Sequence, residues 1–156
     1  MAAVILVRID NRLIHGQIIE TWLPYTGAQR VFVANDELVH DVLQQEIMSL
    51  AIPQTVDSFF VSVEGLSRAV EDNGYGEGHD VIILFSNCSD ARRAFDAGFG
   101  FDILNVGNVH YSPGKRQVSP SVALSDEDES CLRHLSRKGV ELDFRCVPND
   151  QVQVRF

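Results

Sequence analysis

The chain has 156 residues, and its 13 lysines and arginines against 22 aspartates and glutamates leave a formal net charge of −9 at pH 7. This balance argues against a nucleic-acid-binding protein, because proteins that follow a phosphate backbone need a basic face. The length fits a single domain over residues 1–156, and no apolar run reaches the roughly 20 residues that a membrane-spanning helix needs.

Cysteine usage and the N-terminal run favour a cytoplasmic protein. The three cysteines, Cys88, Cys131 and Cys146, are an odd number without a C-x-x-C pair, which suits reduced thiols better than a disulfide framework. The run from Ala2 to Val7 lacks the charged segment before it and the small-residue cleavage site after it that mark a secretory signal. We expect this run to form the first strand.

Seven short β-branched or aromatic runs alternate with helix-like stretches, which is the spacing of β-α units. Three of these runs are apolar nearly throughout, as parallel strands covered on both faces are. We therefore predict an α/β fold with an open, mainly parallel seven-stranded sheet and helices on both faces. The predicted strands are Val4–Arg8, Arg30–Ala34, Ser58–Val61, Val81–Phe85, Asp102–Val106, Val118–Leu124 and Glu141–Val147.

Cap and stop residues predict where helices lie between the strands. One helix is predicted from a cap at Asn35 or Asp36 to about Ala51. Ser89 is the predicted cap of a later helix, and Gly98 supplies a left-handed residue just past its end. In the first of these helices, the apolar residues near one face are Leu38, Val42, Ile47 and Leu50.

The best-defined helix follows Ser125. Acidic residues occupy positions 126–129, and basic residues, with His134 among them, crowd the far end before Gly139. Side-chain charge therefore complements the helix dipole at both ends, a pattern typical of a solvated, stabilised helix.

The loop after the first strand holds the densest set of reactive side chains, in the sequence Arg8-Ile9-Asp10-Asn11-Arg12-Leu13-Ile14-His15-Gly16-Gln17. In open α/β sheets, ligands bind beyond the carboxyl ends of the strands. His15 stands at the predicted start of a helix that runs towards Trp22, where free backbone N–H groups and the positive end of the helix dipole attract an anion.

These residue types suit phosphoryl transfer without a metal or other cofactor. The His15 imidazole is a competent nucleophile towards phosphorus, and the charge on the phosphoryl oxygens needs fixed positive partners. Arg12 is the candidate bidentate partner, Arg8 is a second cation or a brace for the loop, and Asp10 orients Arg12 through an ion pair. Gly16 lets the backbone approach the phosphate closely. The spacing alone leaves a plainer alternative open, a surface ion-pair cluster in which His15 only caps a helix.

Other phosphoryl-handling classes lack their motifs. The third predicted strand ends in Val61-Ser62-Val63 and has no acceptor aspartate, and a phosphatase loop after Cys88 needs an arginine where Ala94 stands. No P-loop motif and no zinc-ligand spacing occurs in the sequence. The glycine-rich stretch from Gly74 to Gly78 follows a helix rather than a strand, so it is not a dinucleotide fingerprint.

The loop Arg8-Ile9-Asp10-Asn11-Arg12-Leu13-Ile14-His15-Gly16-Gln17 resembles the phosphorylation-site loop of the IIB components of the mannose/fructose/sorbose family of the bacterial phosphotransferase system. The resemblance covers essentially the whole chain. Its further motifs are Val33-Ala34-Asn35-Asp36, Leu50-Ala51-Ile52-Pro53, Ile103-Leu104-Asn105-Val106-Gly107-Asn108, and the closing segment from Gly139-Val140-Glu141 to Val147-Pro148.

This resemblance implies a cytoplasmic phosphocarrier, associated with the inner face of the membrane through its permease. In that role His15 accepts a phosphoryl group from a phosphohistidine on a IIA partner and passes it to a sugar that enters through the membrane subunits IIC and IID. The catalytic residues are then His15, Arg12 and Asp10, and the resemblance points to Nδ1 as the phosphorylated nitrogen. The expected phosphate-binding residues are Arg8, Arg12, Gly16 and Gln17.

The chain departs from the family pattern at two positions. Asn11 stands where many members carry a second aspartate, which only reduces negative charge near the phosphate. Asn108 stands where members often have glycine, so the loop after the fifth strand is expected to approach the site differently.

The remaining histidines are weighed separately. His40 and His79 are expected at the surface. His110 lies in the loop that follows the fifth predicted strand, at the same end of the sheet as His15. With Lys115 and Arg116 it forms a candidate docking surface for the partner protein.

A second function stays open on the sequence alone. A regulatory phosphorelay protein of the same fold would signal through phosphorylation of His15 without transferring phosphate to a sugar, and it would need the same loop.

Overall fold

The protein is described here from a computed structural model, which covers residues 4–73 and 80–154. The expectations for His79 and for the stretch 74–78 lie outside the described residues. The strands are β1 (Val4–Asp10), β2 (Arg30–Ala34), β3 (Asp57–Val61), β4 (Val81–Phe85), β5 (Ile103–Asn108), β6 (Arg116–Ser119), β7 (Val122–Leu124) and β8 (Glu141–Asp143). The helices are α1 (Leu23–Thr26), α2 (Val42–Leu50), α3 (Leu66–Asn73), α4 (Cys88–Asp96) and α5 (Asp126–Arg137).

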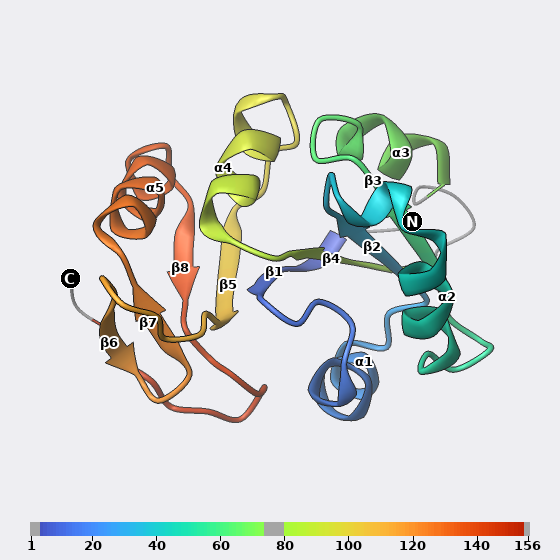
Figure 1. The fold of residues 1–156 in the computed structure, drawn as a ribbon, viewed down its shortest axis with the longest axis horizontal. Coiled ribbons are helices and arrows are strands. Elements are labelled where there is room, and N and C mark those ends of the chain that lie inside the picture. The colour runs from blue at the N-terminus through green and yellow to red at the C-terminus, as the bar shows by residue number, and fades with distance from the viewer. Residues whose placement is uncertain (1–3, 74–79, 155–156) are drawn as a thin grey trace.

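Six strands form one sheet in the order β3-β2-β4-β1-β5-β8, and every neighbouring pair is parallel. Helices α3, α4 and α5 lie on one face of this sheet and α1 and α2 on the other (Figure 1). Parallel strands need such crossover helices, and the covering helices explain why β4 is buried throughout. The predicted α/β class, with a mainly parallel sheet and helices on both faces, is confirmed.

The strand count differs from the expectation in one region. The run Val118–Leu124, expected as one strand, divides into β6 and β7, which pair antiparallel as a separate two-stranded sheet. The chain turns between them at Pro120 and Ser121, where proline has no N–H to donate to a ladder. The main sheet therefore has six strands rather than seven.

Two helix starts differ from the predicted caps. Asp41 caps α2 by accepting from the Gln44 N–H at 3.1 Å, whereas Asn35 Oδ1 accepts from the Leu38 N–H at 2.9 Å, at the start of a separate short 3-10 turn over Leu38–His40. Asn87, rather than Ser89, caps α4. Asp41 directly precedes α2 and Asn87 directly precedes α4, whereas Ser89 lies inside α4. Sequence alone does not decide between such neighbouring candidates.

The apolar residues of the helix predicted after β2 also differ from expectation, because only one of the four lies in the core. Leu38 is buried, but Val42, Ile47 and Leu50 face solvent. The sheet face beneath this region is covered by a core that includes Trp22 and the partly buried Met48.

The last helix matches its prediction. Ser125 and Asp128 form a reciprocal capping box at the start of α5, and Gly139 follows the helix with φ of 95°. Gly98 likewise has a positive φ, 109°, just beyond α4. Among the described residues, no helix is long and apolar enough to cross a membrane.

Candidate functional site

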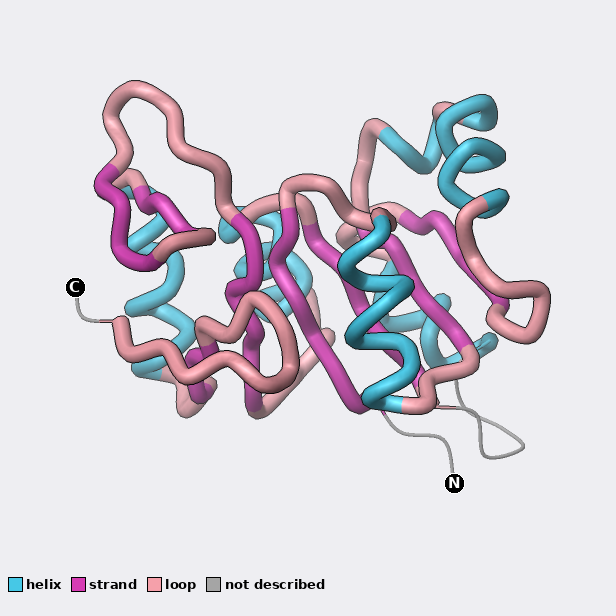
Figure 2. Tube along the Cα trace, turned by 90° about the horizontal axis from the view of Figure 1, so that it is seen from below, coloured by secondary structure: helices cyan, strands magenta, loops and turns pink. Residues whose placement is uncertain are grey.

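The reactive loop lies at the carboxyl end of β1, between the ends of β4 and β5. The crossover after β1 runs to one face of the sheet and the crossover after β4 runs to the other, which makes this a topological switch point (Figures 1 and 2). The loop turns tightly, since the Leu13 N–H donates to the Asp10 carbonyl at 3.0 Å and Leu13 has a φ of 57°. The buried Leu13 side chain anchors that left-handed conformation and brings His15 back over Asp10.

The register between β1 and β5 places polar side chains from both strands together. Arg8 pairs with Asn105, and Asp10 pairs with Asn108. Partners in register lie on the same face of a sheet, so the two residues of each pair are neighbours at the site. All four side chains are buried.

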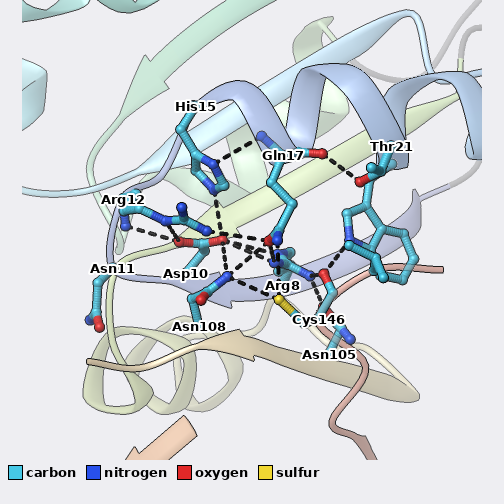
Figure 3. Close-up of polar contacts among 12 residues, drawn as sticks. Arg8, Asp10, Asn11, Arg12, His15, Gln17, Thr21, Asn105, Asn108 and Cys146 are labelled. Atoms are coloured by element: carbon cyan, nitrogen blue, oxygen red, sulfur yellow. Dashed lines mark hydrogen bonds and ion pairs between the residues drawn. The ribbon is translucent and has the colours of Figure 1, made fainter. Parts of the chain in front are cut away.

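Asp10 is the centre of the site (Figure 3). Its Oδ2 accepts from His15 Nε2 at 2.8 Å, from Arg8 Nη2 at 3.0 Å and from Asn108 Nδ2 at 3.2 Å. Its Oδ1 accepts from the Arg12 backbone N–H at 3.0 Å. A carboxylate with so many donors is held in one orientation, and it holds those donors in turn.

These contacts keep Asp10 ionised. Burial raises the pKa of Asp10, but the hydrogen bonds from His15 and from the Arg12 amide, with the Arg8 charge, outweigh burial and lower the pKa to about 2. An ionised carboxylate only accepts hydrogen bonds, so His15 Nε2 must carry the proton that it donates. The lone pair of the neutral ring therefore resides on Nδ1.

His15 Nδ1 faces the start of the following helix. The Gln17 backbone N–H donates to Nδ1 at 3.2 Å. The His15 side chain is 13% exposed, which keeps the ring oriented while leaving it in contact with solvent. An anion attached to Nδ1 would meet the free N–H groups of the helix that runs from Gly16 to Thr26, which contains a π-helical turn over Ile18–Trp22.

Arg12 is the accessible cation of the site. Its side chain is 40% exposed, its Nε lies 3.5 Å from Asp10 Oδ1, and its Nη2 donates to Gln17 Oε1 at 3.3 Å. The ion pair expected between Asp10 and Arg12 is present. The guanidinium thus stands beside the His15 ring with one edge open to an incoming group (Figure 3).

Arg8, in contrast, is completely buried and braces the floor of the site. Its guanidinium donates to Asn105 Oδ1 at 2.8 Å and to the Cys146 carbonyl at 2.9 Å, besides Asp10. Gly107 makes room for it, because a Cβ there would lie 2.0 Å from Arg8 Cζ. Of the two roles expected for Arg8, this geometry favours the brace over direct contact with phosphate.

Gln17 and Gly16 differ in what they contribute. The Gln17 side chain is turned into the floor of the site, where its Oε1 accepts from Arg8 Nη2 and Asn108 Nδ2 at 2.8 and 2.9 Å. Its backbone N–H is therefore the group available to an anion. Gly16 has nothing within 4 Å of the position of a Cβ, so the space beside it is open.

Asn105 and Cys146 were not assigned to this site from the sequence, and Asn108 was noted only as a departure from the family pattern. Asn105 and Asn108 interrupt an otherwise apolar strand, a signal that indicated their motif but not their contacts. Cys146 accepts from Gln17 Nε2 at 3.1 Å through its Sγ, and its carbonyl also accepts from Trp22 Nε1 at 2.9 Å. Nothing in the sequence places residue 146 beside residues 17 and 22.

Of the candidate docking residues, only His110 contacts the reactive loop. The His110 side chain is exposed, and its backbone N–H donates to Asn11 Oδ1. Lys115 and Arg116 form ion pairs with α5, Lys115 with Asp128 at 3.5 Å and Arg116 with Glu129.

The other histidines lie away from the site's hydrogen bonds. His40 is exposed, as expected, and His134 bonds Asp96 of α4 at 3.1 Å. Within residues 4–73 and 80–154, no group of three or more His, Cys, Asp or Glu side chains is arranged to hold a metal ion.

Comparison with known proteins identifies the family. The family model described as "PTS system sorbose subfamily IIB component" matches residues 4–154. A fructose-specific EIIB component of the phosphotransferase system from Bacillus subtilis (strain 168) is 33% identical over 150 residues, 96% of this chain and 91% of that protein. A mannose-specific EIIAB component from Escherichia coli (strain K12) is 32% identical over 145 residues, which are 93% of this chain but 45% of that longer protein.

A solved structure agrees with the sequence matches. The crystal structure of the N-acetylgalactosamine-specific IIB component 1 from Escherichia coli has a TM-score of 0.90 and 30% identity, covering 98% of this chain and 100% of that one. The chain therefore belongs to the sorbose subfamily of IIB components, and the resemblance drawn from the His15 loop is confirmed. It is a component of a phosphotransferase system for sugar transport.

Proposed function

We propose that this protein is a phosphocarrier in which His15 accepts a phosphoryl group on Nδ1 from a IIA phosphohistidine. One observation carries the proposal: the hydrogen bond of 2.8 Å from His15 Nε2 to the buried, ionised Asp10 leaves the lone pair on Nδ1. That lone pair attacks phosphorus, the P–N bond to the donor histidine breaks, and the donor imidazole leaves with its electron pair. Nε2–H keeps its bond to Asp10 throughout, so the ring does not have to reorient.

The surrounding groups supply the positive charge that the transferring phosphoryl group needs. Arg12 offers an exposed guanidinium edge. The Gln17 N–H, which donates to His15 Nδ1 before transfer, donates to a phosphoryl oxygen once Nδ1 is phosphorylated. Arg8 acts indirectly, because its hydrogen bonds hold the side chains of Asp10 and Gln17 in place. Transfer between two histidines requires a near in-line approach, so the complex with IIA is short-lived and contacts the open side of the loop.

The partners follow from the family. One relative bears the name EIIAB component, which supports a IIA domain as the phosphoryl donor. The permease subunits IIC and IID then present the sugar that accepts the phosphoryl group, and they hold this protein at the cytoplasmic face of the membrane. His110 lies beside the His15 loop and contacts IIA, whereas Lys115 and Arg116 support docking by tying the segment that follows His110 to α5.

The test is phosphorylation in a reconstituted system. The protein is incubated with phosphoenolpyruvate, the general phosphotransferase proteins and the cognate IIA, and acid-labile phosphate is mapped. We expect label on His15, none in His15→Ala, and transfer slowed about 100-fold in Arg12→Ala with the fold retained. Arg68→Ala, which removes a guanidinium that is 89% exposed on α3, serves as the control and is expected to match the wild type. Label on another residue, or none, would contradict the assignment.

Addition of IIC, IID and sugar distinguishes transport from regulation. A phosphocarrier loses its label to the sugar, whereas the regulatory protein considered from the sequence keeps the label when sugar is added.

A further inference from the structure

Helix α2 presents an apolar stripe to solvent. Leu43, Ile47 and Leu50, spaced at i, i+4 and i+7, are 68%, 52% and 87% exposed, and Val42 beside them is also exposed. This is the spacing by which a surface helix normally buries one face against its own core. Here the core side of α2 is occupied instead by Met48 and by Gln45, which donates to the carbonyls of Leu38 and Val39. The stripe is therefore a surface that the fold itself does not use.

The stripe continues into a groove beside the edge of the sheet. β3 is an edge strand, and the groove between α2 and β3 is lined by Val42 and Leu50 from the helix and by Phe60 from the strand. Ser49 and Ser58 bridge its two walls with a hydroxyl contact of 3.1 Å. Helix and edge strand together form one exposed surface, which is apolar along the stripe and mixed in the groove, where Gln45, Glu46, Ser49 and Ser58 also line the walls. We call it the α2–β3 surface.

The charged residues that α2 and β3 themselves contribute, Glu46 and Asp57, are both acidic. Residues 31–67 contain no lysine or arginine, and all of their acidic residues are exposed, namely Asp36, Glu37, Asp41, Glu46, Asp57 and Glu64. Arg93 of α4 pairs with Asp36 and Glu64. Among the described residues, no lysine, arginine or histidine lies within ion-pair distance of the carboxylates of Glu37, Asp41, Glu46 or Asp57. A partner complementary to an apolar stripe with an acidic rim has an apolar contact surface and basic residues around it.

We propose that the α2–β3 surface docks on the cytoplasmic side of the membrane subunits IIC and IID, an inference that rests on the proposed function. The cytoplasmic loops of membrane proteins carry an excess of lysine and arginine, which complements the acidic rim. A second copy of this chain would bring the same carboxylates face to face, and an anionic lipid surface would also repel them.

The position of the α2–β3 surface suits a carrier whose His15 serves both IIA and the permease. β3 is three strands from β1, which is about 14 Å at roughly 4.8 Å per step. α2 begins at the same sheet end as the His15 loop and runs away from it along the flank of the molecule (Figure 1). A permease bound there leaves the His15 loop free to meet IIA.

The experiment measures binding to inside-out membrane vesicles that contain IIC and IID, by co-sedimentation. We expect the double variant Leu43→Asp/Ile47→Asp to bind at least tenfold more weakly than the wild type. The charge variant Glu37→Lys/Glu46→Lys is expected to bind three- to tenfold more weakly at low salt. Its deficit should shrink as ionic strength rises from about 0.05 to about 0.3 M, because salt screens exposed charges.

Matched controls lie at the opposite end of the sheet. Ile103→Asp changes an apolar residue of β5 that is 51% exposed, and Glu141→Lys reverses an exposed charge on β8; both are expected to bind as the wild type does. Vesicles without IIC and IID are expected to bind no variant. His15 labelling by IIA is expected to stay within twofold of the wild type in every variant, which separates docking from phosphorylation.

Three results would overturn the docking assignment: double-variant binding equal to that of the wild type, binding that does not require IIC and IID, or a wild-type dimer in sedimentation velocity that Leu43→Asp/Ile47→Asp dissolves. The last result would assign the surface to a second copy. Loss of His15 labelling in the wild type, with vesicle binding intact, would contradict the proposed function instead.

Discussion

At the scale of single residues, the site depends on one carboxylate that serves several donors. Asp10 sets the His15 tautomer, receives the buried Arg8 charge and accepts from the Arg12 amide. A buried arginine without its carboxylate is costly, so Asp10 and Arg8 stabilise the fold as well as the reactive loop. The residues that orient the imidazole are therefore also residues that stabilise the protein.

This coupling predicts a pH dependence of stability. The pKa of Asp10 is about 2 in the folded protein against 3.8 ordinarily, so its contribution is fully present above about pH 4 and is lost as pH falls through the folded pKa. The difference in unfolding free energy between the wild type and Asp10→Asn should shrink by roughly 2 kcal/mol between pH 5 and pH 2. Urea denaturation of both proteins across this range measures it, since the other carboxylates contribute equally to each. A difference that stays constant with pH would show that Asp10 is not held ionised in the folded protein.

At the scale of elements, helix starts were predictable where one residue satisfied every local requirement. Ser125 has the capping side chain, a carboxylate three residues later and acidic residues throughout the first turn. The region after β2 offers Asn35, Asp36 and Asp41 in close succession, and in the structure Asn35 accepts from the Leu38 N–H at a 3-10 turn while Asp41 caps α2. Competing caps of similar strength leave the boundary to be decided by how the chain packs.

The α5 cap gives a test at this scale. Ser125→Ala removes the hydroxyl that accepts from the Asp128 N–H, and it should lower the unfolding free energy by about 1 kcal/mol. Ser136→Ala, an exposed position near the end of the same helix, should change it by less than about 0.5 kcal/mol. Denaturant titrations that gave equal values for the two variants would argue against the capping box as a source of stability.

At the scale of the whole molecule, the C-terminal segment completes the site. The carbonyl of Cys146 accepts from Arg8 of β1 and from Trp22 of the π-helical turn that precedes α1. Arg8 Cζ and Arg145 Cζ each lie 5.4 Å from the centre of the Trp22 ring. Residues from both ends of the chain therefore share one buried cluster.

Because residues from both ends of the chain contact one another in this cluster, we predict that the chain unfolds as one domain. The single tryptophan, Trp22, reports on contacts between both chain ends, and far-ultraviolet circular dichroism reports on all helices. The two signals should follow one urea transition with the same midpoint, as expected for a two-state domain of this size. Separate midpoints would indicate that the C-terminal part folds independently.

The sequence by itself determined most of the strand runs, the α5 helix, and the loop with its histidine, arginine and aspartate, because side-chain alternation, caps and reactive groups are properties of neighbouring residues. The runs Val118–Leu124 and Glu141–Val147 are exceptions, since the first divides into β6 and β7 and the second is a strand only over Glu141–Asp143. Only the tertiary structure decided that Arg8 is a buried brace, that Asn105 and Asn108 stand beside Arg8 and Asp10, and that Cys146 closes the floor of the site. It also decided that the apolar stripe of α2 faces outward. These features depend on which strands become neighbours and in what register, and such pairings join residues that lie far apart along the chain.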